Sequence, residues 1–234
     1  MCIAGGKIID LSRHLVVQQQ AAHASPRTVR QFAAHDHLCF EGDPRTHVFV
    51  VESGWVKIYR TLVDGQRQVV GFANAGSVLG LESAGEHLNS CEAVTPVTVR
   101  PIAVSRLDDM CARDPAFAQQ LIAQLGRQLG AAQAQLATVG AQSAEQKLAT
   151  FLLTIADLSS AAPGEAFDLP MRRGDMAEFL GLRLETVSRK MTEFQRRRWI
   201  SMTSLYHCVI LRRDTLEQLA VGGETDDVHP RRAG

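Results

Sequence analysis

The sequence contains near its C-terminal end the run Gly181-Leu182-Arg183-Leu184-Glu185-Thr186-Val187-Ser188-Arg189-Lys190-Met191. Apolar residues recur at helical spacing on both sides of Gly181: Met176, Ala177 and Leu180 precede it, and Val187, Met191 and Phe194 follow it. Two short helices that cross at a glycine turn produce this pattern. We therefore predict a helix-turn-helix in this part of the chain.

The second predicted helix carries polar side chains on the face opposite its apolar stripe. Glu185, Ser188 and Arg189 share that face, with Thr186 beside them. A carboxylate accepts a hydrogen bond from cytosine N4, a guanidinium donates to guanine O6 and N7, and a hydroxyl suits several bases. These residues predict sequence-specific contacts in a DNA major groove. The alternative is a solvated face on which Glu185 and Arg189 form an i,i+4 ion pair.

Two basic residues depart from the usual pattern of such a helix. Arg183 lies just before Leu184, where an N-cap Ser, Thr, Asp or Asn is expected, and it cannot accept from the free amides. The mismatch costs about 1 kcal/mol of stability, and we predict that a phosphate contact by Arg183 offsets it. Lys190 occupies a position that is usually apolar, so we predict that it extends outward toward DNA without reading a base.

A basic run and a β-prone segment follow this helix. The predicted helix ends in the basic run Arg196-Arg197-Arg198. Residues 206–211 then show a weak alternation that includes β-branched side chains, and this predicts the hairpin of a winged helix-turn-helix. Residues 168–213 hold ten Lys and Arg against five Asp and Glu, a net charge of +5, whereas the whole chain is neutral. This local basic face, with Arg196 in it, predicts phosphate contacts. For the arginine run alone, a solvated helix end favoured by the helix dipole is the alternative.

The composition leaves room for two modest domains, because the chain has 234 residues and 45% of them are hydrophobic. No run resembles a membrane span or a signal peptide, so we expect a cytoplasmic protein without a membrane partner. The cysteines are odd in number and scattered, without the close spacing of a zinc or cluster site: Cys2, Cys39, Cys91, Cys111 and Cys208. We expect free or buried thiols in a reducing compartment.

Between about Val29 and Leu107, short β-prone runs alternate with turn sequences. The runs are 48–51, 56–59, 69–72 and 97–99, and the turns are 41–44, 52–54, 64–65 and 74–76. Regular alternation of this kind predicts a small antiparallel β-barrel or jelly-roll. The pair Asp64-Gly65 is a strong signal for a hairpin between its neighbouring strands.

A long helix with one narrow apolar stripe is predicted after the barrel. The stripe has a 3,4,3,4,3 spacing and consists of Ile122, Leu125, Leu129, Ala132, Leu136 and Val139. So narrow a stripe favours a two-stranded coiled coil, and packing on the chain's own barrel is the alternative. A homodimer suits the DNA-binding unit, because two recognition helices about 34 Å apart read a palindrome.

These patterns together predict an α+β fold with five consecutive parts. They are an N-terminal extension (1–28), a β-barrel (29–110), a dimerisation helix (111–143), a winged helix-turn-helix (144–219) and a flexible tail (220–234). The fourth part begins with a helix over 145–158, and a turn at 161–164 follows it.

The order of these parts resembles that of the Crp/Fnr family of bacterial transcription regulators, over about 29–219. The resemblance rests on Glu41-Gly42-Asp43, Val51-Glu52-Ser53-Gly54, Asp64-Gly65 and 182–189. It implies that the barrel is a double-stranded β-helix, or jelly-roll, of the cyclic-nucleotide-binding type. It also implies an activator whose protein partner is RNA polymerase.

The run from Glu185 to Arg189 is similar to that of the Fnr and FixK branch of this family. Because that branch reads TTGAT-type half-sites, the resemblance implies that a homodimer binds a palindrome such as TTGAT-N4-ATCAA. Glu185 and Arg189 would address the central G·C pair, and Ser188 would address a neighbouring thymine. Gene control in anaerobic or microaerobic cells, or in response to nitrogen oxides, is implied as well.

The resemblance also bears on cyclic AMP, which some members bind. Gly80-Leu81-Glu82-Ser83 matches their nucleotide-binding segment in part, but Asn89-Ser90 stands where they have an Arg-Ser or Arg-Thr pair. A buried phosphate would therefore lack its guanidinium partner. Ala132 and Gln133 also lack the hydroxyl pair that contacts adenine in those members. We predict that cyclic AMP does not control this chain.

An oxygen-labile iron-sulfur cluster of the Fnr type needs four cysteine ligands, three of them close together near the N-terminus. This chain has only Cys2 there, and Arg100 falls near the place of the fourth ligand. We therefore predict a FixK-like regulator that needs no cofactor. Three alternatives stay open: haem held by one of the histidines, a redox switch at Cys208, and a cyclic nucleotide.

An enzyme is the remaining alternative, because barrels of this shape also hold metal sites. His35-Asp36-His37 and Glu41 have the H-x-H-x3-E spacing of a cupin site for iron or manganese. Glu41, however, lies in a turn, and no glycines frame the motif as they do in cupins. We therefore predict exposed or hydrogen-bonded histidines, no metal and no enzymatic activity.

Overall fold

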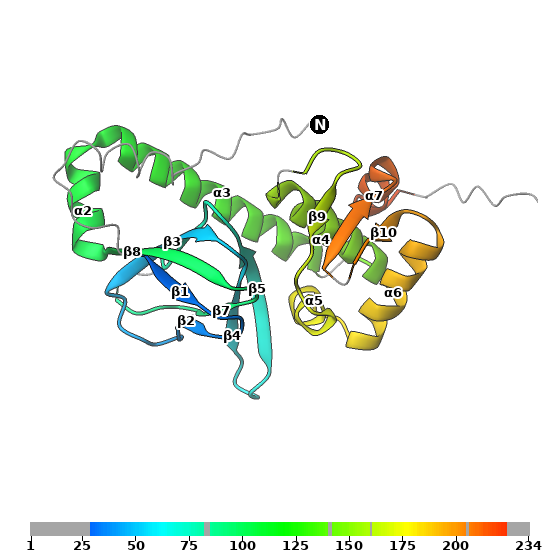
Figure 1. Ribbon diagram of the computed structural model, residues 1–234, viewed down its shortest axis with the longest axis horizontal. Helices are drawn as coiled ribbons and strands as arrows, with labels where there is room; N and C mark the ends of the chain where they lie inside the picture. The colour runs from blue at the N-terminus through cyan, green and yellow to red at the C-terminus, as the bar shows by residue number, and fades with distance from the viewer. Residues whose placement is uncertain (1–28, 82–84, 140–141, 160, 205, 224–234) are drawn as a thin grey trace, which may run out of the picture. The chain divides into compact units, whose positions relative to one another are not determined.

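The computed structural model describes residues 29–81, 85–139, 142–159, 161–204 and 206–223. The chain forms two compact units, residues 1–133 and residues 134–234, whose elements are labelled in Figure 1. The predicted extension over 1–28 and most of the predicted tail lie outside the described residues. None of the described helices combines the length and hydropathy that crossing a membrane requires.

Short antiparallel strands form a barrel in the first unit. They are β1 (Arg30–Phe32), β2 (His37–Cys39), β3 (His47–Ser53), β4 (Val56–Thr61), β5 (Arg67–Ala73), β6 (Val78–Leu79), β7 (Ser90–Ala93) and β8 (Val97–Ala103). They pair in two four-stranded sheets, of order β1-β8-β3-β6 and β2-β7-β4-β5. Strands that are distant in the sequence are neighbours in each sheet. This is a jelly-roll, as the sequence predicted.

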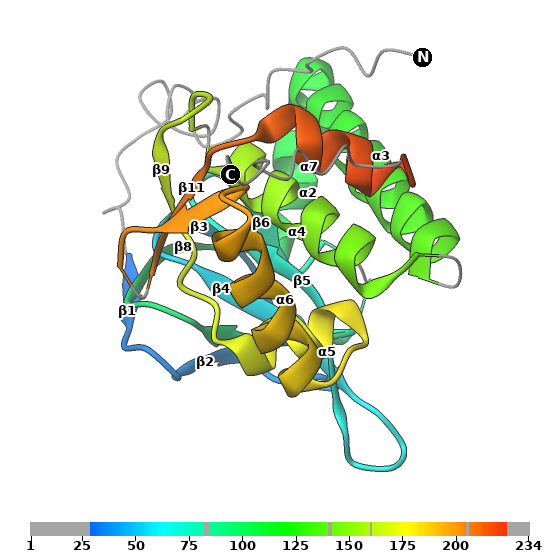
Figure 2. The same ribbon diagram turned by 90° about the vertical axis from the view of Figure 1, so that its right-hand side faces the viewer.

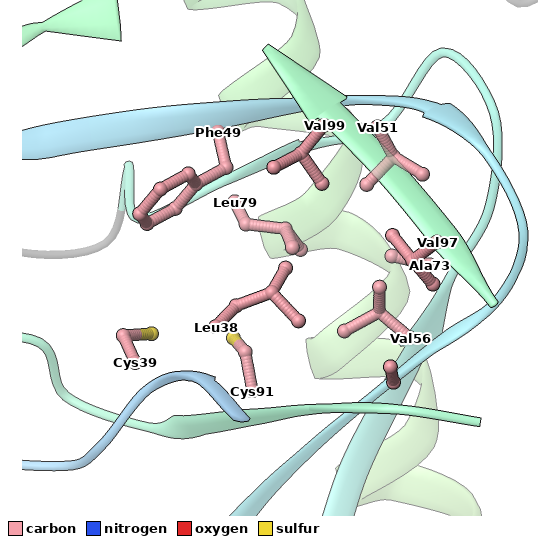
Figure 3. Close-up of a cluster of buried hydrophobic side chains, with 11 residues drawn as sticks. Leu38, Cys39, Phe49, Val51, Val56, Ala73, Leu79, Cys91, Val97 and Val99 are labelled. Carbon is pink, nitrogen blue, oxygen red and sulfur yellow. The ribbon is translucent and has the colours of Figure 1, made fainter. Parts of the chain in front are cut away.

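The barrel core lies between the two sheets (Figure 3). Successive side chains of a strand face opposite sides, so alternate residues such as Phe49 and Val51 in β3 point inward. The other buried members are Leu38, Cys39, Val56, Ala73, Leu79, Cys91, Ala93, Val97 and Val99. The space between the sheets is therefore filled by apolar side chains.

The predicted hairpin at Asp64-Gly65 joins β4 to β5. The Leu62 N–H donates to the Gln66 carbonyl at 2.8 Å, and the Gln66 N–H donates to the Asp64 carboxylate at 3.0 Å. Gly65 has a φ of 81°, a conformation that costs a residue without a Cβ little. The turn chemistry of these two residues thus sets the strand pairing here.

Two helices follow the barrel where the sequence predicted one. α2 (Val104–Arg113) ends at Asp114, and α3 (Pro115–Val139) begins directly after it. The Asp114 carboxylate accepts from the backbone N–H groups of Ala116 and Phe117, which caps α3. Phe117 is fully buried and packs with α2 on the outer face of the β1-β8-β3-β6 sheet. The helical part therefore starts earlier than 111, and the break at Asp114 turns the chain.

The second unit combines helices with a three-stranded sheet, and Figure 2 labels its helices α4, α5, α6 and α7. Its elements are α4 (Ala144–Leu158), β9 (Ala166–Asp168), α5 (Arg173–Leu180), α6 (Leu184–Arg196), β10 (Ile200–Met202), β11 (His207–Ile210) and α7 (Arg213–Ala220). The sheet order is β10-β11-β9. The hairpin of β10 and β11 is the predicted wing, so the winged helix-turn-helix architecture and the α+β class are confirmed. The sequence did not predict β9 or α7.

Candidate DNA interface

A left-handed glycine sets the turn between α5 and α6. Gly181 has φ 62° and ψ 42°, and the Leu182 N–H donates to the Ala177 carbonyl at 3.0 Å, which closes the end of α5. Glycine adopts this conformation at little cost because it has no Cβ, and it commonly terminates helices for this reason. The chain then enters α6 at Leu184.

The two faces of α6 differ as the sequence predicted. Val187, Met191 and Phe194 are at most 1% exposed, and they anchor α6 on α5 and α4. Glu185, Ser188 and Arg189 are exposed, whereas Thr186 is half-buried. Thr192 is also exposed, and its hydroxyl donates to the Ser188 carbonyl. We did not predict Thr192, although its position four residues after Ser188 marks the same face.

The carboxylate and the guanidinium on this face are not paired with each other. Within the described part of the chain, no salt bridge includes Glu185 or Arg189. The structure therefore does not match the alternative interpretation, in which Glu185 and Arg189 form an i,i+4 ion pair on a solvated face. Both charged groups are available to a partner.

The start of α6 has the cap mismatch that the sequence predicted. Arg183 is the N-cap residue, with φ −77° and ψ 147°, and its side chain makes no capping hydrogen bond. Its carbonyl accepts from Thr186 and Val187, so the first turn forms without a side-chain cap. Arg183 is exposed at the positive end of the helix dipole, where it can meet an anion.

The position of the Lys190 side chain contradicts our prediction that it extends outward toward DNA. Its side chain is 21% exposed, and its ammonium donates to the Glu145 carboxylate at the start of α4 and to Glu193 Oε2 at 2.9 Å. Lys190 therefore does not extend outward, because two carboxylates within the same unit hold its charge. Glu145 precedes Lys190 by 45 residues, so no local pattern could have predicted the pair.

The arginine run at the end of α6 divides into different environments. Arg197 Nη2 donates to Glu193 Oε1 at 2.6 Å, and its guanidinium lies 4.8 Å from the centre of the Trp199 ring. Arg196 and Arg198 are exposed, and Arg198 has a φ of 55° where the chain turns into β10. Arg197 therefore has a structural role, whereas Arg196 faces solvent.

Cys208 in the wing is a poor redox sensor. It is fully buried in β11, and burial raises the pKa of its thiol to about 12 even though nearby Arg173 lowers it. The reactive form of cysteine is the thiolate, which hardly forms at neutral pH in such a site. A buried structural thiol describes this residue.

The histidines considered for a metal site have other partners. His35 Nδ1 lies 3.2 Å from Glu92 Oε1, and His37 Nε2 lies 2.9 Å from the Tyr59 hydroxyl. Glu41 instead accepts from Arg60 at 3.1 Å. Among the described residues, no group of three or more His, Cys, Asp or Glu side chains is arranged to hold a metal ion.

The predicted dimerisation stripe is partly within the described side chains. Ile122, Leu125 and Leu129 are 68%, 36% and 60% exposed, so they are not packed on the barrel. The side chains of the other three members, Ala132, Leu136 and Val139, lie outside the described set. Arg100 is elsewhere: it is buried in β8, and its Nε donates to Glu52 at 2.9 Å.

Comparisons with known proteins agree with this arrangement. Residues 29–114 match the family model of the cyclic nucleotide-binding domain, and residues 146–219 match that of the Crp-like helix-turn-helix domain. The chain is 32% identical over 199 residues to the nitrogen fixation regulation protein FixK of Rhizobium meliloti, which covers 85% of this chain and 90% of that protein. It is 30% identical to the fumarate and nitrate reduction regulatory protein of Escherichia coli K12, over 80% of this chain and 75% of that protein.

A solved structure is similar over nearly its whole length. The structure of FixK2 from Bradyrhizobium japonicum superposes with a TM-score of 0.77 at 30% sequence identity. The match covers 83% of this chain and 98% of that one. Sequence and fold thus point to the same group of proteins.

Proposed function

Because this chain belongs to the Crp/Fnr family of DNA-binding transcription regulators, we propose that it binds a TTGAT-N4-ATCAA-like palindrome in promoter DNA. The outer face of α6 carries this proposal. There Glu185, Ser188 and Arg189 face solvent together, with no ion pair between Glu185 and Arg189 among the described residues. Carboxylate and guanidinium in this arrangement suit the cytosine and guanine of the central G·C pair, and the hydroxyl suits the neighbouring thymine.

Phosphate contacts would come from the basic residues that surround this face. Arg183 at the start of α6 and Arg196 at its end are both exposed. Each can bind one phosphate, and release of counterions from these phosphates makes the affinity depend on salt. Lys190 is not part of this set, because Glu145 and Glu193 hold its ammonium.

A homodimer is the form that we propose to bind the palindrome. Ile122, Leu125 and Leu129 present an apolar stripe to solvent along α3, and a second copy of the helix would cover it. Two α6 helices related by twofold symmetry then read two half-sites about 34 Å apart. The proposed location is the cytoplasm, where RNA polymerase is the partner of an activator bound upstream of a promoter.

The conditions of action are proposed from the relatives and from the barrel. The names of the relatives concern nitrogen fixation and fumarate and nitrate reduction, which favours genes controlled by low oxygen or by nitrogen oxides. The interior of the barrel is filled with apolar side chains such as Phe49 and Leu79. Asn89-Ser90 stands where the nucleotide-binding members carry an arginine for the phosphate, and this difference supports a regulator that binds DNA without a cyclic nucleotide.

Binding of the purified, ligand-free protein to a duplex with TTGAT-N4-ATCAA tests the proposal, with a scrambled duplex for comparison. We expect salt-sensitive binding that prefers the palindrome. The Arg189→Ala variant should lose about 1–3 kcal/mol of discrimination for each half-site. Equal affinity of the wild type for both duplexes would contradict the half-site assignment, or would mean that an effector is required.

A further inference from the structure

Lys190 lies on the recognition helix but is directed away from its base-reading face. Its ammonium donates to Glu145 and Glu193, and the side chains of these residues are 30% and 19% exposed. Glu193 also accepts from Arg197. The four charged side chains Glu145, Lys190, Glu193 and Arg197 form one chain of alternating sign, which we call the α4–α6 ion network.

Glu145 is held in place by its own helix. It lies in the first turn of α4, which begins with a capping box: the Ser143 side chain accepts from the Gln146 N–H, and the Gln146 side chain accepts from the Ser143 N–H. A carboxylate at a helix N-terminus is also favoured by the helix dipole. Glu145 is therefore an ordered hydrogen-bond acceptor on α4 for the ammonium of Lys190, which lies on α6.

The contact between Lys190 and Glu193 favours the charged form of both side chains. The hydrogen bond to Glu145 is the main cause that raises the pKa of Lys190, and the hydrogen bond from Lys190 is the main cause that lowers the pKa of Glu193. A phosphate would have to displace two carboxylates to bind this ammonium. A direct role of Lys190 in DNA binding is therefore disfavoured by the geometry.

We propose that Glu145 and Lys190 are positioning residues, which fix the rotation of α6 relative to α4 and thereby aim the base-reading side chains. The reason is adjacency: Lys190 directly follows Arg189, so a restraint on Lys190 is a restraint on the backbone from which Arg189 projects. The apolar anchors of α6 hold the helix on the unit, and the ion pair adds a directional contact to them. This inference rests on the proposed function of α6.

The Glu145→Gln variant separates positioning from direct binding, because the two roles predict opposite results. It removes one of the two carboxylates that hold Lys190 and makes the unit more positive, so a phosphate-binding Lys190 would bind every duplex at least as tightly as before. A positioning pair predicts the reverse for the palindrome. We expect the preference for the palindrome over the scrambled duplex to fall roughly tenfold, within the range of coupling inside one ion-pair network.

The conservative variant Lys190→Arg completes the test, because it keeps a cation beside both Glu145 and Glu193. It should keep most of the preference that Glu145→Gln loses. The Lys190→Met variant should leave the salt dependence of binding unchanged, whereas the control Arg196→Ala should lower the salt slope by about 1. Thermal unfolding of each variant reports whether it is folded.

Two results would overturn the inference. One is an unchanged or higher preference for the palindrome in Glu145→Gln, and the other is a lower salt slope in Lys190→Met. Failure of the proposed half-site is recognised separately, because then the wild type itself does not discriminate. In that case a duplex selected by the wild type from a randomised library replaces the palindrome, and the same variants still decide the role of the ion pair.

Discussion

Among the residues that the structure describes, charged side chains are buried and paired on one surface of this protein, and exposed and unpaired on another. On the outer face of the β2-β7-β4-β5 sheet, Glu92 is only 6% exposed, and Lys57 Nζ and His35 Nδ1 each lie 3.2 Å from its carboxylate. Arg67 lies 3.6 Å away. On the outer face of α6, Glu185 and Arg189 are exposed, and neither forms a salt bridge within the described chain.

The difference follows from the free energy of desolvation. A charge removed from water must be compensated by partners in the fold, or it destabilises the protein by several kcal/mol. A charge that stays in water needs no such partner and can be desolvated later, when DNA binds. The Glu92 cluster therefore stabilises the barrel, and the charges of α6 remain available for the DNA recognition that we propose.

The largest expected effect is on DNA affinity, and it concerns the exposed apolar stripe on α3. If a second copy covers the stripe on α3, Leu129→Asp places a charge in that contact and yields a monomer. Loss of the second recognition helix should weaken binding to the palindrome by about 10²–10⁴-fold, the usual gain from linking two sites. Sedimentation measures the change in mass, and DNA titration measures the change in affinity.

Ala123→Asp is the control, since Ala123 is exposed but lies off the stripe. The same oligomeric state and the same DNA affinity in both variants would exclude this dimer contact.

The Glu92→Gln variant should destabilise the barrel, because it leaves the nearly buried Lys57 ammonium without its carboxylate. Removal of one partner of a buried pair costs about 3 kcal/mol. Denaturant unfolding measures the loss, and DNA preference should stay unchanged once the protein is folded. Glu41→Gln is the control: its pair with Arg60 is more exposed, so the cost should stay below about 1 kcal/mol. A similar cost for both variants would contradict the comparison.

The same cluster gives the wild type a defined acid response. Burial alone raises the pKa of Glu92, but the hydrogen bond with His35 and the charge of Lys57 outweigh it and lower the pKa below 4.5. A lowered folded-state pKa means that the carboxylate stabilises the fold above the unfolded value and that this contribution disappears as the pH falls through the folded value. The stability difference between the wild type and Glu92→Gln should therefore shrink as the pH falls below about 4.5.

The smallest expected effect concerns Arg183, where stability and recognition oppose each other. Arg183→Ser supplies a capping hydroxyl and should stabilise the DNA-binding unit by about 1 kcal/mol. It also removes a proposed phosphate contact, so affinity for every duplex and the salt slope should both fall. Arg183→Lys keeps the charge without a cap, and it should change neither property. An unchanged salt slope in Arg183→Ser would remove Arg183 from the interface.

The sequence alone predicted those features that depend on neighbouring residues. Gly181 marked the turn, the spacing of Val187, Met191 and Phe194 marked the buried face of α6, and Asp64-Gly65 marked a hairpin. Backbone conformation and helical or strand periodicity are local properties, so a single sequence expresses them. The exposure of Glu185, Ser188 and Arg189 follows from the same periodicity.

The tertiary structure decided which charges are held inside the fold. The sequence could not show that Lys190 pairs with Glu145 or that Lys57 and Arg67 lie beside Glu92. Nor could it show that β9 pairs with β11 of the wing. Such contacts join residues far apart in the chain, and many partners of suitable charge are available to each before folding. Periodicity determined the direction in which α6 presents its side chains, whereas packing determined which of those side chains stay free to bind DNA, because only the folded chain brings distant charges within reach of one another.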